Sequence, residues 1–106
     1  MEWIQLNHPD KLDEIAALSH QSPQYIFKHS TRCSISTVAK NRLEKGVLKN
    51  AKIFYLDLLA YRLISNEVSA RWNIIHQSPQ LLKIVNGSCT YHASHLEIDP
   101  EEVVSC

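Results

Sequence analysis

The order of the predicted elements indicates an α/β fold, a mixed four-stranded sheet with helices on both faces. A predicted helix separates two apolar segments of strand length, at 24–29 and 52–58, and such a β-α-β unit is parallel in nearly all known proteins. Two extended runs within 81–93 are joined by Asn86-Gly87, a strong hairpin signal that adds two antiparallel strands. The 106 residues suffice for one core, so we expect a single domain over 1–106.

The first part of the chain predicts a helix and then a strand. After an apolar lead-in at 3–6, residues 7–10 supply a cap, an early proline and an acidic residue. We expect a helix from Pro9 to about Gln21, ended by Ser22-Pro23. Residues 24–29 are rich in Tyr, Ile and Phe, which favours a short strand.

A second helix is predicted directly after Cys33. Apolar residues recur at helical spacing from Ser34, and Lys45-Gly46 supplies a basic last turn and a glycine stop. The nearly continuous apolar run at 52–58 is typical of a central strand that is covered on both faces. These elements complete the β-α-β unit.

The last part of the chain predicts a third helix, the hairpin and a short closing helix. Ser65 is the expected N-cap of a helix over 66–72, while 59–64 stays open between loop and helix. Asp99-Pro100 and the acids that follow open the last helix. Helix, strand, helix, strand, helix, hairpin and helix is the thioredoxin-like arrangement.

Cys33 is the candidate active-site residue. It follows the first strand and precedes a helix, whose first backbone N–H groups are unpaired and carry partial positive charge. That position, with Lys28, His29 and Arg32 nearby, favours the thiolate, which is the nucleophilic form of cysteine. Ligands of open α/β sheets also gather beyond the carboxyl ends of parallel strands. Ser36 makes the motif Cys-x-x-Ser, with one thiol.

The composition excludes several classes of protein. Lysines and arginines number 11, as do acidic residues, so the zero net charge indicates no nucleic-acid partner. No basic leader or run near ~18 apolar residues is present, so we expect a cytoplasmic protein without a membrane partner. Cys33, Cys89 and Cys106 are too widely spaced for a disulfide framework, and His92 and His95 lack the converging partners that zinc needs. Reduced thiols and no metal are expected.

Several residues keep two interpretations. Cys33 is either the reactive thiol or a buried inert one. Cys89 is favoured as strand packing, and Cys106 is a resolving thiol or an incidental tail residue. His29 either tunes Cys33 or lies at a strand end in water. Asp57 either transfers protons or caps a turn, and the turn is favoured.

Several short motifs are spread over nearly the whole chain, and two of them, the cysteine turn and the Ser-Pro-Gln segment, lie far apart in it. The motifs are Lys28-His29-Ser30-Thr31-Arg32-Cys33-Ser34-Ile35-Ser36, Tyr55-Leu56-Asp57, Arg62, Ile64-Ser65-Asn66, His76-Gln77-Ser78-Pro79-Gln80 and Ala93-Ser94-His95.

This set resembles the YtxJ-type monothiol bacilliredoxin family over nearly the whole chain. The resemblance implies a thioredoxin-like fold and thiol-disulfide exchange with bacillithiol, a small thiol that acts as co-substrate, with no bound cofactor. It also implies that Pro79 is a cis-proline facing the cysteine and that Ser78 pairs with substrate backbone. The family usually has proline after the cysteine, where this chain has Ser34. The residues expected in the active-site turn, beside the catalytic Cys33, are His29, Thr31, Arg32, Ser34 and Ser36.

The leading hypothesis is an enzyme, a monothiol thiol-disulfide oxidoreductase that removes a small thiol from protein mixed disulfides through Cys33. The expected partners are a low-molecular-weight thiol and S-thiolated client proteins, and the expected state is a monomer or weak dimer. One alternative is a thioredoxin-like binding or scaffold module that holds an extended peptide beside Ser78 and Pro79. Another is a redox sensor whose Cys33 is oxidised by peroxide.

Overall fold

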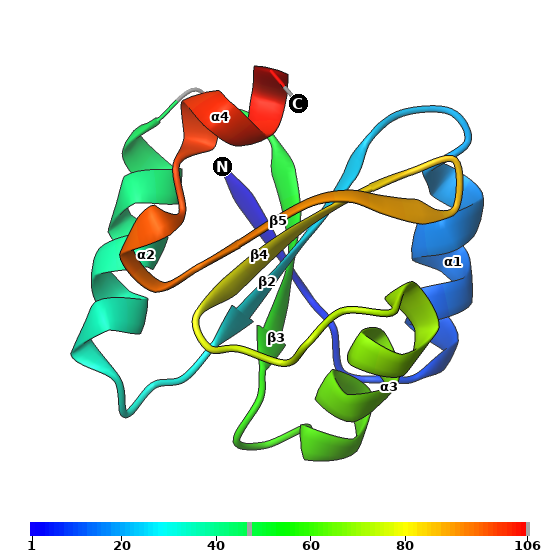
Figure 1. Cartoon of the computed structure of the whole chain (residues 1–106), viewed down its shortest axis with the longest axis horizontal. Helices are drawn as coiled ribbons and strands as arrows, with labels where there is room; N and C mark the ends of the chain where they lie inside the picture. The colour runs from blue at the N-terminus through cyan, green and yellow to red at the C-terminus, as the bar shows by residue number, and fades with distance from the viewer. Residues whose placement is uncertain (47, 106) are drawn as a thin grey trace.

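A five-stranded mixed sheet forms the centre of the protein in the computed structural model, which describes residues 1–46 and 48–105 (Figure 1). The order across the sheet is β1-β3-β2-β4-β5, with β1, β3 and β2 parallel and β4 and β5 antiparallel to their neighbours. The strands are β1 (Glu2–Gln5), β2 (Gln24–His29), β3 (Lys52–Asp57), β4 (Gln80–Val85) and β5 (Ser88–Ser94).

The prediction of four strands is wrong because the apolar lead-in is itself a strand. Residues 2–5 pair in parallel with β3, placing Trp3 beside Ile53. A strand of 4 residues is too short to show a clear alternation. It forms because the open edge of β3 offers backbone hydrogen-bonding groups that need partners.

Helices cover both faces of the sheet, as predicted. Two apolar clusters define the faces: Leu12 of α1 and Val68 of α3 belong to one, and Leu43 of α2 and Val103 of α4 belong to the other. Figure 1 shows α1 and α3 together on one side and α2 and α4 on the other. The helices are α1 (Asp10–Leu18), α2 (Ser34–Lys45), α3 (Arg62–Trp72), the 3₁₀ helix η1 (His95–Glu97) and α4 (Pro100–Ser105).

Some helix boundaries differ from the predictions. α1 ends at Leu18 instead of Gln21. Pro9 occupies the N-cap position of α1, and the backbone N–H of Asp10 bonds to His8 Nδ1 at 3.2 Å. α3 begins at Arg62, so the prediction of Ser65 as its N-cap is wrong. The residue is fully buried inside the helix, where packing rather than capping fixes it.

The Asn86-Gly87 hairpin is confirmed. Both residues have positive φ, 50° and 80°, which a two-residue turn of this kind requires and which glycine adopts at low cost. Ser19 at the end of α1 holds this turn, because its hydroxyl accepts from Gly87 N–H at 2.8 Å and its carbonyl from Asn86 N–H at 2.9 Å. Within the described residues, no helix is long and apolar enough to cross a membrane.

Candidate active site

Cys33 occupies the N-cap position of α2. β2 ends at His29, and a short turn follows in which Cys33 N–H donates to Ser30 O at 3.2 Å. The extended backbone of Cys33, φ −114° and ψ 118°, then leads into the helix, where its carbonyl accepts from Thr37 N–H at 3.3 Å. The thiol is free and half-buried. A partly exposed cysteine therefore lies at a helix N-terminus, where unpaired backbone N–H groups carry partial positive charge.

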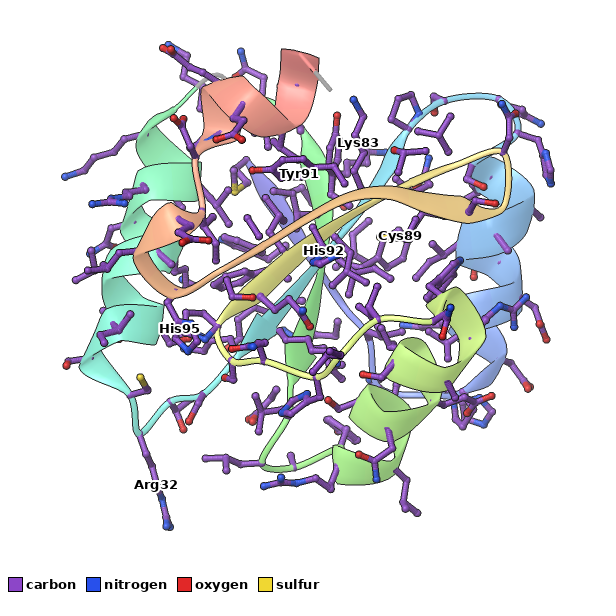
Figure 2. The ribbon with its side chains drawn as sticks, in the orientation of Figure 1. Arg32, Lys83, Cys89, Tyr91, His92 and His95 are labelled. Atoms are coloured by element: carbon purple, nitrogen blue, oxygen red, sulfur yellow. The ribbon has the colours of Figure 1, made fainter. Side chains whose placement is uncertain are left out.

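The turn before Cys33 is open to solvent. Thr31 and Arg32 are exposed, and so is Ser34, the first residue of α2. Figure 2 shows the Arg32 side chain extending away from the rest of the protein. These exposed residues flank Cys33 in the chain.

Behind the turn, a buried hydrogen-bond relay joins β2 to α2. Ser36 is fully buried, and its Oγ lies 2.6 Å from His29 Nδ1 and accepts from Ser30 N–H at 3.1 Å. Because Ser36 Oγ already accepts from Ser30 N–H, its own proton is free to be donated to His29 Nδ1. This hydrogen bond places the imidazole proton on Nε2. The relay fixes the first turn of α2 on the end of β2.

His29 is buried, with 5% of its surface exposed, so the interpretation of a side chain in water is wrong. Burial lowers the pKa of His29; the charge of Lys40 lowers it further, and Asp57 opposes both. The ring lies between Phe27 and Tyr55, with centroids at 5.7 and 5.4 Å. A neutral imidazole that positions Ser36 follows from these contacts.

The Ser78-Pro79 peptide bond is cis, as the resemblance implied. Lys28 pairs with Gln80 at the last step of the β2–β4 ladder, so the register brings Pro79 level with His29, the last residue of β2, and Ser78 level with the turn that leads to Cys33. Pro79 O accepts from His95 N–H at 2.9 Å. Within the described part of the chain, Ser78 makes no backbone hydrogen bond, and its buried hydroxyl has no partner.

A shallow hollow of about 480 Å³ lies beside the start of α2. Ile35 of α2 and Gln77 of the loop before β4 form one part of it, and His95 with its neighbours forms the rest. His95 is exposed and has a positive φ of 56°, which is uncommon for a residue with a side chain. Figure 2 shows it between α2 and this loop. No sequence pattern predicted this hollow.

The structure separates Lys28 from the other basic neighbours of Cys33. Alternation along β2 turns Phe27 and His29 toward α2 and Lys28 toward α3, where its Nζ donates to Ser65 O at 3.2 Å. Sequence reasoning missed this placement. The sequence feature that could have indicated this placement is a lysine within an apolar strand, at a position whose side chain faces a covering helix.

Other candidate residues have structural roles. Cys89 Sγ donates to Tyr91 O at 3.3 Å, and burial raises the pKa of this thiol, as expected for packing. Asp57 Oδ1 accepts from Leu59 N–H at 3.1 Å and from Ala60 N–H at 3.4 Å, so its interpretation as a turn residue is confirmed. Cys106 lies outside the described residues. No three His, Cys, Asp or Glu side chains within 1–46 and 48–105 converge on a possible metal position.

A second, larger hollow of about 950 Å³ lies between the later part of α2, β5 and the start of α4. Arg42 and Lys45 border it on one side and Glu101 and Glu102 on another. The hollow reaches the last turn of α2, whereas Cys33 precedes the first.

Comparisons with known proteins agree with this geometry. One solved structure, a candidate oxidoreductase with a thioredoxin fold, superimposes with a TM-score of 0.84 at 24% identity, covering 97% of this chain and 91% of the other. Malassezia sympodialis thioredoxin gives 0.72 at 15% identity, covering 99% and 86%. Spinach chloroplast thioredoxin f gives 0.71 at 11%, covering 98% and 88%. These likenesses establish the thioredoxin-like fold.

The family assignment comes from a separate comparison. The family model of the monothiol bacilliredoxin BrxC matches residues 4–103, nearly the whole chain. Its members are thioredoxin-like oxidoreductases with a thiol redox role and thiol substrates, linked to bacillithiol. The chain therefore belongs to the monothiol bacilliredoxin BrxC family.

Proposed function

We propose that this protein removes bacillithiol from protein mixed disulfides by thiol-disulfide exchange at Cys33. The observation that carries the proposal is a free, half-buried thiol at the N-terminus of α2, beside a cis-proline loop whose Ser78 backbone is unpaired among the described residues. The whole chain, 1–106, would act as one cytoplasmic domain, a monomer or weak dimer with no bound cofactor.

The exchange proceeds in two balanced steps. The Cys33 thiolate attacks the bacillithiol sulfur of the mixed disulfide, a new S–S bond forms, and the client leaves as a thiolate that takes up a proton. A second bacillithiol thiolate then attacks the Cys33 mixed disulfide, which releases oxidised bacillithiol and restores Cys33. The client is reduced, and two bacillithiol molecules end as one disulfide.

The neighbouring residues have supporting roles in this proposal. Ser78 pairs through its free backbone groups with the extended client segment, as an added strand does. His29 and Ser36 hold the first turn of α2, while Thr31, Arg32 and Ser34 form the exposed rim that a client contacts. Ser36 stands where a resolving thiol would be needed for a two-cysteine cycle, so the small thiol must reset Cys33.

Turnover with a bacillithiolated model protein and excess reduced bacillithiol tests the proposal. Mass spectrometry follows release of the client thiol. We expect release by the wild type and by Cys89→Ser, and none above background with Cys33→Ser. If Cys33→Ser retains full activity, the site assignment is wrong, and if the wild type binds client peptides without releasing the thiol, the protein is a binding module.

A further inference from the structure

A lysine is buried beneath the cis-proline loop. The Lys28 side chain in β2 has no exposed surface, and among the described residues it makes no ion pair with a carboxylate. Removing an ammonium group from water is costly unless its environment compensates. A buried, unpaired cation one residue before His29 therefore needs an explanation from its contacts.

Three acceptors surround the three donor positions of this ammonium. Lys28 Nζ donates to Ser65 O at 3.2 Å and to Ser69 Oγ at 3.0 Å, and it lies 3.1 Å from His76 Nδ1. An ammonium has three protons and no lone pair, so all three contacts are hydrogen bonds only when Nδ1 carries no proton. Protonation of His76 would turn the third contact into a repulsion between two cations.

His76 belongs to the loop that carries Ser78 and Pro79. A second anchor holds the same loop, because Gln80 Nε2 donates to the carbonyl of Ile75 at 3.1 Å. Gln80 is itself fully buried and pairs with Lys28 across the β2–β4 ladder. The loop is thus fixed at two adjacent residues by side chains from two paired strands, close to the cis peptide bond.

We propose that Lys28 is a positioning residue for exchange at Cys33: its bond to His76 holds the cis-proline loop so that Ser78 is presented to the client backbone. This inference rests on the proposed function. Protonation of His76 releases the loop and weakens client binding, which makes His76 the acid-sensitive part of the contact.

The charges around the pair agree with this arrangement. Burial, then the positive charges of Lys28 in β2 and Arg62 in α3, lower the pKa of His76, so its ring is neutral at neutral pH and accepts a hydrogen bond. Burial lowers the pKa of Lys28 to about 8, which still leaves the ammonium form dominant at pH 7. The bond is therefore formed at neutral pH and is lost in acid.

Another lysine provides a matched control. Lys83 in β4 is also buried, and its Nζ donates to Val103 O at 3.0 Å. It lies on the other face of the sheet, against α4, as Figure 2 also indicates. Lys83→Met therefore removes a buried ammonium without touching the cis-proline loop.

The test measures kcat and KM for a bacillithiolated protein, and separately the rate with the small disulfide of bacillithiol, which has no extended client backbone for Ser78 to pair with. We expect Lys28→Met and His76→Ala to raise KM for the protein about tenfold. Both should leave the rate with the small disulfide unchanged, and Lys83→Met should match the wild type in both assays. His76 is exposed, so its variants test the proposal even if Lys28→Met does not fold.

His76→Asn distinguishes positioning from general support of the fold. The Asn Oδ1 replaces Nδ1 as an acceptor but does not titrate. This variant should keep the wild-type KM at pH 7.5 and lose the rise in KM that we expect for the wild type at pH 5.5. A wild-type KM in His76→Ala at both pH values would overturn this inference while leaving exchange at Cys33 intact. A wild type that forms no Cys33 adduct would overturn the proposed function itself.

Discussion

Ser36 connects the two chain segments that form the site. Its hydroxyl is buried between His29 on β2 and the Ser30 backbone, so the residue at the position of a second motif cysteine is a structural link in this protein. A serine at this position has two consequences. It leaves the motif with one thiol, and it satisfies two polar groups that would otherwise be buried without partners.

Replacing Ser36 with alanine should lower the free energy of unfolding by about 1 to 3 kcal/mol, because Ser30 N–H and His29 Nδ1 lose their partner. Urea unfolding measures this change. Thr37→Ala, at the next and exposed position, is the control and should stay near the wild type. Equal urea midpoints for the two variants would show that the relay does not support the fold.

Lys28 makes stability depend on pH in an alkaline window. Burial lowers its pKa from 10.5 to about 8, so between these values the unfolded chain binds a proton that the folded protein has released. Stability attributable to Lys28 therefore rises with pH in this window. The unfolding free energy of the wild type, relative to Lys28→Met, should increase by about 2 kcal/mol from pH 8 to pH 9.5.

Urea unfolding of both proteins at each pH checks this prediction. Taking the difference between them removes the contribution of other groups, such as Cys89, whose raised pKa acts in the opposite direction. A difference that does not change with pH would mean that Lys28 titrates as it does in water.

At the scale of elements, the sequence predicts best where local chemistry decides the structure. The bounds of β2 and α2 are confirmed because a polar turn separates an apolar strand from a periodic helix, and Gly46 ends that helix. The hairpin is confirmed because Asn86-Gly87 admits positive φ. β1 and the start of α3 were missed because the edge of β3 and packing against the sheet, respectively, decide them.

The first turn of α2 accommodates the proline that the family usually has. Cys33 has an extended backbone, as residues before proline prefer, and Ser34 is the first helical residue, where proline fits. Ser34 N–H donates no hydrogen bond within the described part of the chain. Neither the backbone of Cys33 nor the hydrogen bonds of the described residues therefore oppose proline at this position.

Ser34→Pro should raise the free energy of unfolding by about 0.4 to 1 kcal/mol, mainly because it restricts the unfolded chain. Thermal or urea unfolding measures the change, with Ser34→Ala as the control for loss of the hydroxyl. A destabilised Ser34→Pro would mean that α2 begins with a backbone that proline cannot adopt.

At the scale of the whole molecule, the site combines segments that are far apart in sequence. Cys33 is the N-cap of α2, whereas Pro79 precedes β4, and the β2–β4 pairing brings them to one end of the sheet. The cysteine was predictable because strand, turn and helix are contiguous around it. The cis bond was predictable only by resemblance, and the contacts of Lys28 depend on which face of β2 meets α3.

Exchange at Cys33 is tested most simply by the intact mass of the reduced protein after incubation with oxidised bacillithiol, followed by peptide mapping. We predict a single bacillithiol adduct on Cys33 that excess free thiol removes. Cys89 should stay unmodified, since its thiol donates to Tyr91 O and burial raises its pKa, which disfavours the nucleophilic thiolate. If Cys33 stays unmodified while Cys89 or Cys106 carries the adduct, Cys33 is not the exchanging thiol.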